Sequence, residues 1–168
     1  MAESAWAQRP LPSPGPDAVL LRRWEPSTPA DLTAHRKQLA AALHDGARPP
    51  GADAGAVERL LLVFEELVSN ALRHGHAPVR AEVTTFDHFW LLDVTDAAAD
   101  QPPTPAVGRD AAHGGLGLYL VARLCGAYGW TVAGVRKHVW ARIDYTHAEA
   151  PGWVPRPRRE TDGHSSSV

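Results

Sequence analysis

The chain has 168 residues, with 17 Lys and Arg against 19 Asp and Glu, which gives a formal charge of −2 at pH 7. This length predicts one domain with its own hydrophobic core. The single cysteine, Cys125, excludes an internal disulfide framework, and the near-neutral charge without a basic block argues against direct nucleic-acid binding. No stretch approaches the ~18 consecutive apolar residues of a membrane span, so we expect a cytoplasmic protein without a membrane contact.

Glycine and proline are abundant, at 14 and 15 residues, and many of them gather at the two ends. Residues 1–16 place prolines at alternate positions from Pro10 to Pro16 and lack the apolar run of a signal peptide. Residues 149–168 are rich in proline, arginine and serine. The sequence therefore predicts two disordered tails around a domain that spans residues 17–148.

The first half of this domain predicts a strand and two helices. An apolar run over residues 18–25 is typical of a strand, and Thr28 then caps a helix that reaches about residue 44. Asp53 caps a second helix, whose apolar residues recur at helical spacing until Gly75 ends it.

The second half predicts a hairpin, a long loop, a helix and a closing hairpin, over residues 79–95, 97–114, 116–128 and 130–145. Loops as long as the one over residues 97–114 are most often lids or binding loops. The whole order predicts an α+β fold. We expect a two-layer sandwich, with the helices on one face of a mixed, mainly antiparallel sheet.

Glu66 and Asn70 lie four residues apart, on the same face of the second helix. An amide oxygen at this position can ligate a hard cation such as Mg²⁺, and a carboxylate one turn away can deprotonate an attacking hydroxyl. The same spacing is also typical of the solvated face of any amphipathic helix, and the helix alone favours that interpretation. Asn70 fits it less well, because asparagine prefers helix caps to helix interiors.

Two further features follow along the chain. Asp96 lies where a strand runs into the long loop. Its carboxylate can accept a hydrogen bond from an exocyclic amine. The alternative is that Asp96 is an ordinary aspartate at the start of a loop. Gly114, Gly115 and Gly117 lie at the start of a helix, where free N–H groups and the helix dipole favour an anion. A plain glycine-rich turn is the alternative. Arg109 can reach phosphate oxygens from the same loop, or it is a solvated arginine.

Taken together, Glu66-x-x-x-Asn70-x-x-x-His74-Gly75, Asp96 and Gly115-x-Gly117-Leu118 resemble the N, G1 and G2 boxes of the GHKL (histidine-kinase-like, Bergerat-fold) ATPase superfamily. The segment 129–141 is similar to the closing strands of the anti-sigma-factor serine/threonine kinases of bacterial partner switching. The resemblance covers about residues 20–145 and implies ATP and Mg²⁺ as cofactors.

The resemblance also implies roles for single residues. Glu66 matches the general base, Asn70 the Mg²⁺ ligand and Asp96 the carboxylate that binds adenine. Gly115 and Gly117 match the phosphate-facing turn of the lid. The other residues that we expect at the nucleotide are His74, Arg109, Leu116 and Leu118.

The first glycine motif departs from that pattern. The superfamily has Asp-x-Gly-x-Gly, whereas here Asp96 is followed by Ala97-Ala98-Ala99-Asp100. Ala98 adds a methyl group near the base, and Asp100 adds a charge near the lid. Weaker nucleotide binding or a differently hinged lid would follow from these changes.

Three functions are therefore open at this point. The first is a serine kinase that phosphorylates an anti-anti-sigma (STAS) protein and sequesters a sigma factor, as the resemblance implies; some relatives form homodimers. The second is an ATP-gated module that sequesters a regulator without kinase turnover, which the altered glycine motif favours. The third is an α+β interaction domain that binds no nucleotide.

Overall fold

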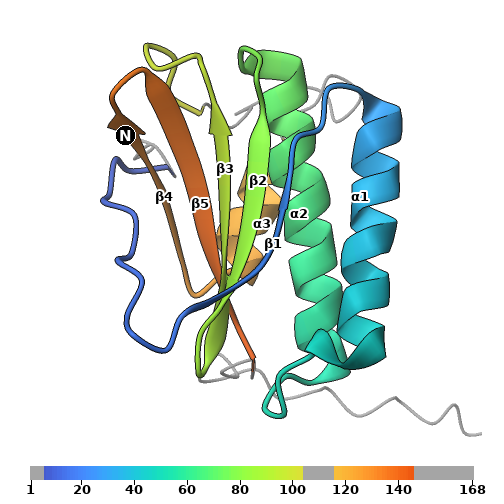
Figure 1. Ribbon diagram of the computed structural model, residues 1–168. Coiled ribbons are helices and arrows are strands. Elements are labelled where there is room, and N and C mark those ends of the chain that lie inside the picture. Colours follow the sequence, from blue (N-terminus) through green and yellow to red (C-terminus); the bar gives the residue numbers. More distant parts are fainter. Residues whose placement is uncertain (1–5, 104–115, 146–168) are drawn as a thin grey trace, which may run out of the picture.

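The order of helices and strands follows local signals in the sequence. In the computed structural model, which describes residues 6–103 and 116–145, the predicted order is confirmed (Figure 1). A short π-helical turn, η1, joins the first two helices. The elements are β1 (Val19–Trp24), α1 (Pro29–Ala42), η1 (Leu43–Ala47), α2 (Ala54–His74), β2 (Arg80–Thr85), β3 (Phe89–Asp96), α3 (Leu116–Leu124), β4 (Ala127–Ala133) and β5 (Arg136–Asp144).

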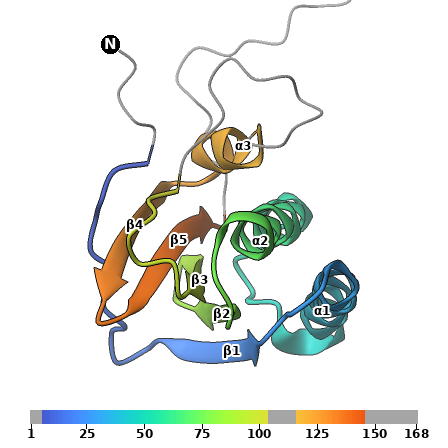
Figure 2. The same cartoon turned by 90° about the horizontal axis from the view of Figure 1, so that it is seen from above.

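The strands form one five-stranded sheet in the order β1-β2-β3-β5-β4. All four pairs of neighbouring strands are antiparallel, where the sequence predicted a mixed sheet. Among the described residues, the parallel contact is an isolated bridge between Gln8 and Trp130. Figure 2 shows the helices along one face of the sheet, so the predicted two-layer α+β fold is confirmed.

Side-chain caps fix where the two long helices begin. The Asp31 backbone N–H donates to Thr28 Oγ1 at 3.1 Å, and the Asp31 carboxylate accepts from the Thr28 N–H at 2.9 Å. At the start of α2, Asp53 Oδ1 accepts a hydrogen bond from the Ala56 N–H at 2.6 Å. Such a cap stabilises a helix by about 1 kcal/mol. The helix starts predicted at Thr28 and Asp53 are confirmed.

The core lies between the sheet and α2. On β3, the alternate residues Trp90, Leu92 and Val94 are at most 1% exposed and face the helices. Phe64 of α2 meets Trp24 of β1 edge to face, with ring centroids 5.1 Å apart. Each large apolar side chain buried here stabilises the fold by about 1.5–3 kcal/mol, so α2 is held firmly over the middle of the sheet.

Two boundaries differ from the prediction in the last third of the chain. Helix α3 ends at Leu124 instead of near residue 128, and β4 already begins at Ala127. The Gly126 N–H donates to the Arg142 carbonyl at 3.0 Å, so the backbone joins β5 at this point. Strand pairing at long sequence separation, which periodicity does not reveal, therefore ends the helix early.

The N-terminal segment also differs from the prediction of a tail over residues 1–16. Trp6 is 2% exposed, and its indole stacks at a tilt on Tyr128, with ring centroids 4.9 Å apart. The Arg9 N–H donates to the Trp130 carbonyl at 2.9 Å, which aligns the segment with the outer edge of β4. Residues 6–9 thus belong to the folded domain, because one large aromatic side chain fills a gap beside α3. Residues 1–5 and 149–168 lie outside the described residues.

Within the described ranges, we find no helix with the length and apolar character needed to span a bilayer.

Candidate functional site

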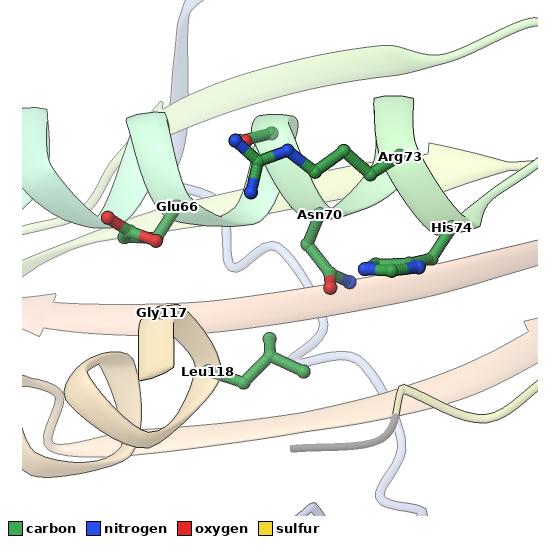
Figure 3. A pocket seen from close by; sticks show the side chains of 7 residues that line it. Glu66, Asn70, Arg73, His74, Gly117 and Leu118 are labelled. Atoms are coloured by element: carbon green, nitrogen blue, oxygen red, sulfur yellow. The ribbon is translucent and has the colours of Figure 1, made fainter. Parts of the chain in front are cut away.

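Polar side chains line the face of α2 that lies against the start of α3 (Figure 3). The pocket between the two helices is lined by Glu66, Ser69, Asn70, Arg73, His74, Gly117 and Leu118. Because residues three and four apart share a helix face, the α2 residues form one continuous polar row. The structure thus brings together five residues that the sequence singled out, and it adds Ser69 and Arg73, which the motif alone did not indicate.

Glu66 is a partly buried carboxylate in this row. Desolvation raises the pKa of Glu66 above its usual value, the adjacent negative charge of Glu65 raises it further, and Arg73 opposes the shift. A carboxylate with a raised pKa binds a proton more strongly, which suits a general base. The electrostatics therefore agree with the base role that the sequence suggested.

Gly117 lies directly against this carboxylate. A Cβ atom built at Gly117 would lie 2.0 Å from Glu66 Oε2 and 3.0 Å from Glu66 Cδ. Only a glycine therefore allows the first turn of α3 to lie this close to the Glu66 side chain. Leu118, the next residue, is 2% exposed, and its carbonyl accepts a hydrogen bond from the Trp6 indole at 3.3 Å.

Asp96 lies at the end of β3 and is 1% exposed. Its Oδ1 accepts from the Ala98 N–H at 2.7 Å and, more weakly, from the His76 N–H at 3.5 Å. A Cβ atom at Gly75 would lie 2.6 Å from Asp96 Cγ. The glycine that ends α2 therefore leaves the space that this carboxylate fills. The backbone of Gly75 is extended, at φ −84°, and does not adopt the left-handed conformation of a typical helix-ending glycine.

Lys137 is the residue at this end of the site that the sequence analysis missed. It pairs with Asp96 across the antiparallel β3 and β5 strands, and its Nζ lies 3.3 Å from Asp96 Oδ2. Only the strand register would have revealed it, because 41 residues separate the two in the sequence. The altered glycine motif lies beside this pair, where Ala98 is fully buried and Asp100 is exposed.

Arg109 and Gly115 lie outside the described residues, and the predicted loop over residues 97–114 is described only as far as Pro103. Leu116 is the first residue of α3.

The donor set of the pocket fits a magnesium nucleotide. Asn70 offers an amide oxygen and Glu66 a carboxylate, which are the oxygen ligands that Mg²⁺ prefers. Within residues 6–103 and 116–145, no group of three or more His, Cys, Asp or Glu side chains could hold a metal ion alone. An ion held by few protein ligands keeps waters and phosphate oxygens in its shell, as Mg²⁺ usually does.

Comparison with known proteins decides the family. The family profile described as the histidine kinase-like ATPase domain matches residues 26–143, which is more than half of the chain. The chain belongs to the histidine kinase-like ATPase family. The resemblance to the GHKL superfamily is confirmed at this level, and with it the assignment of an ATP-binding domain.

Among solved structures, the Acinetobacter baumannii histidine kinase AdeS is similar to this ATPase domain. The identity is 17%, the match covers 77% of this chain and 68% of that chain, and the TM-score is 0.39. A TM-score of this size adds nothing to the family assignment. No curated protein matches the chain.

Proposed function

We propose that this histidine kinase-like ATPase domain is a protein serine/threonine kinase that uses ATP and Mg²⁺. The observation that carries the proposal is the polar row on α2, in which Glu66 and Asn70 face the first turn of α3. When bound, ATP supplies the phosphoryl group. The residues of the row act by binding, by positioning and by moving one proton.

Glu66 accepts the proton of the attacking serine hydroxyl, and its raised pKa favours this transfer. Asn70, one turn further along α2, holds the cation through its amide oxygen. Arg73 and His74 line the same pocket, and the Arg73 guanidinium offers positive charge to phosphate oxygens. Phosphoryl transfer depends mainly on position and charge stabilisation, so this set is sufficient.

The protein substrate that we propose is an anti-anti-sigma (STAS) protein, and the second partner is a sigma factor that the ATPase domain sequesters. This part of the proposal rests on the resemblance of residues 20–145 to the anti-sigma-factor kinases. The test is incubation of the full chain with ATP, Mg²⁺ and candidate STAS proteins, with phosphoserine and ADP both measured. Formation of both in equal amounts supports the kinase, and ATP binding without either product in all candidates contradicts it.

The second candidate is an ATP-gated binding module without turnover. It is favoured by the surroundings of Asp96, which is buried, paired with Lys137 and followed by the alanine-rich turn. Both candidates require ATP binding, so the products distinguish them. In either case, Asn70→Ala should abolish the Mg²⁺-dependent part of ATP binding, whereas Glu58→Ala, at an exposed position of α2 outside the pocket lining, should preserve it.

A homodimer is also part of the proposal. Among the described residues, the large apolar side chains that are exposed lie on β1, α3 and the β4–β5 hairpin and not on α1; they are Val19, Leu20, Tyr119, Leu120, Val132 and Val135. Sedimentation of the purified chain with and without ATP tests the dimer. A single monomer species in both conditions contradicts it.

A further inference from the structure

The buried pair Asp96 and Lys137 is unusual for its position. Each neighbouring pair on the helix-facing side of β3 and β5 is apolar, namely Val94 with Val139 and Leu92 with Ala141. Asp96 and Lys137 continue this row, yet they are 1% and 3% exposed. A buried ion pair is often no more stable than the apolar pair that could replace it. Stability alone therefore does not explain a lysine at this place.

The hydrogen bonds of Asp96 and Lys137 fix the position of both charged groups. Asp96 Oδ1 accepts backbone N–H groups, while Oδ2 lies 3.3 Å from Lys137 Nζ. Lys137 Nζ also donates to the Gln101 carbonyl at 2.9 Å. That carbonyl belongs to the turn after β3, in which the Gln101 N–H donates to the Ala98 carbonyl at 3.1 Å. The Asp96 carboxylate, an acceptor, and the Lys137 ammonium, a donor, thus lie side by side, and the ammonium donates to the carbonyl of the turn.

The edge of adenine presents the complementary pattern, because its 6-amino group is a donor and the adjacent N1 is an acceptor. We propose that Lys137 is a second base-reading residue, which donates to N1 of adenine while Asp96 accepts from the 6-amino group. The proposal rests on the ATP binding proposed above. It assigns the discrimination between bases to two strands, where the motif indicated Asp96 alone.

When the base enters, Lys137 exchanges one hydrogen-bond acceptor for another. When the turn at Gln101 moves aside, Lys137 loses a carbonyl partner, and the ring nitrogen takes its place. The ammonium keeps its acceptor, and the pair as a whole remains neutral. A neutral base therefore meets a neutral site, so the buried carboxylate is never left without a counter-charge.

The same arrangement rejects guanine in the orientation that suits adenine. Guanine presents an acceptor, O6, in place of the 6-amino group and a donor, N1–H, in place of the acceptor. Its O6 would face the Asp96 carboxylate and its N1–H the Lys137 ammonium. Buried polar groups left unpaired in this way strongly disfavour the wrong ligand.

The test is the equilibrium binding of ATP and of 1-deaza-ATP, measured by calorimetry. The analogue 1-deaza-ATP lacks only the N1 acceptor. The unmodified chain should bind 1-deaza-ATP about tenfold more weakly than ATP, as expected for the loss of one hydrogen bond from a charged donor. Lys137→Met should lose about tenfold in ATP affinity and nothing in 1-deaza-ATP affinity. Lys37→Met, at the other lysine of the sequence and exposed on α1, is the matched control and should bind both ligands as the unmodified chain does.

Equal affinity of the unmodified chain for ATP and 1-deaza-ATP overturns the proposal, even where Lys137→Met does not fold. Tighter ATP binding by Lys137→Met overturns it as well, because the ammonium would then only block the carboxylate. A chain that binds no ATP at all contradicts the proposed function instead. The two failures are therefore distinguishable.

Discussion

A single methyl group added at Gly117 should lower the rate of phosphoryl transfer while leaving the stability of the fold nearly unchanged. In Gly117→Ala, the new Cβ would lie 2.0 Å from Glu66 Oε2, far inside van der Waals contact. The carboxylate must move by about 1 Å or more to reach an ordinary contact distance, because Cβ contacts are rarely closer than 3.4 Å. A misplacement of about 1 Å at a reacting group can cost ~100-fold in rate.

The stability of the same variant should change little. Glu66 is a flexible side chain, and holding it away from its preferred rotamer costs about 0.5–1.5 kcal/mol. Replacing glycine by alanine within a helix offsets this by about 1 kcal/mol. The expected free energy of unfolding is therefore within ~1 kcal/mol of that of the unmodified chain.

The assay is single-turnover phosphoryl transfer from ATP to the STAS protein that we propose as substrate, together with urea unfolding of the same samples. Gly55→Ala is the matched control, because it adds the same methyl group in the first turn of α2, where the nearest atom is Arg59 Nη1 at 3.4 Å. It should keep full activity. Full activity of Gly117→Ala would refute the argument that this glycine sets the position of Glu66.

Three further predictions concern the scaffold around the site. Gly75→Ala should destabilise the fold by about 1–3 kcal/mol in urea unfolding, because the new Cβ would lie 2.6 Å from Asp96 Cγ and from the Ala71 carbonyl; an unchanged midpoint would contradict it. Trp6→Ala should cost about 3 kcal/mol by the same measurement, whereas a disordered segment would cost nothing. The hydrogen bond to Asp93 raises the pKa of His138, so the stability from this pair is full below pH 6.5 and is lost as the pH rises through the folded pKa. His138→Gln should therefore be clearly less stable than the unmodified chain at pH 5.5, and the difference in free energy of unfolding should be smaller at pH 8. The same difference at both pH values would contradict the pairing.

The parts of the fold that were predictable from the sequence are those set by local chemistry. Thr28 and Asp53 cap their helices through their own side chains, and the apolar spacing along α2 indicates which face is buried. The polar row containing Glu66 and Asn70 follows from the same helical period. These features need no knowledge of the rest of the chain.

The features that were missed depend on contacts between distant segments. Trp6 packs beside Tyr128 although prolines follow it in the sequence, and Lys137 meets Asp96 only through the register of β3 and β5. The early end of α3 has the same origin, since pairing with β5 takes the backbone after Leu124. Neither periodicity nor a motif carries this information.

The most direct measurement of the central claim is single-turnover phosphoryl transfer by Glu66→Gln beside Glu65→Gln. The two substitutions remove the same charge at adjacent positions, but Glu65 is exposed and forms an ion pair with Arg36 at 3.0 Å. If Glu66 is the base, Glu66→Gln should lose ~10²–10⁴-fold in rate while still binding ATP, and Glu65→Gln should transfer at nearly the unmodified rate. Equal rates for the two variants would contradict the assignment of Glu66 and with it the kinase mechanism.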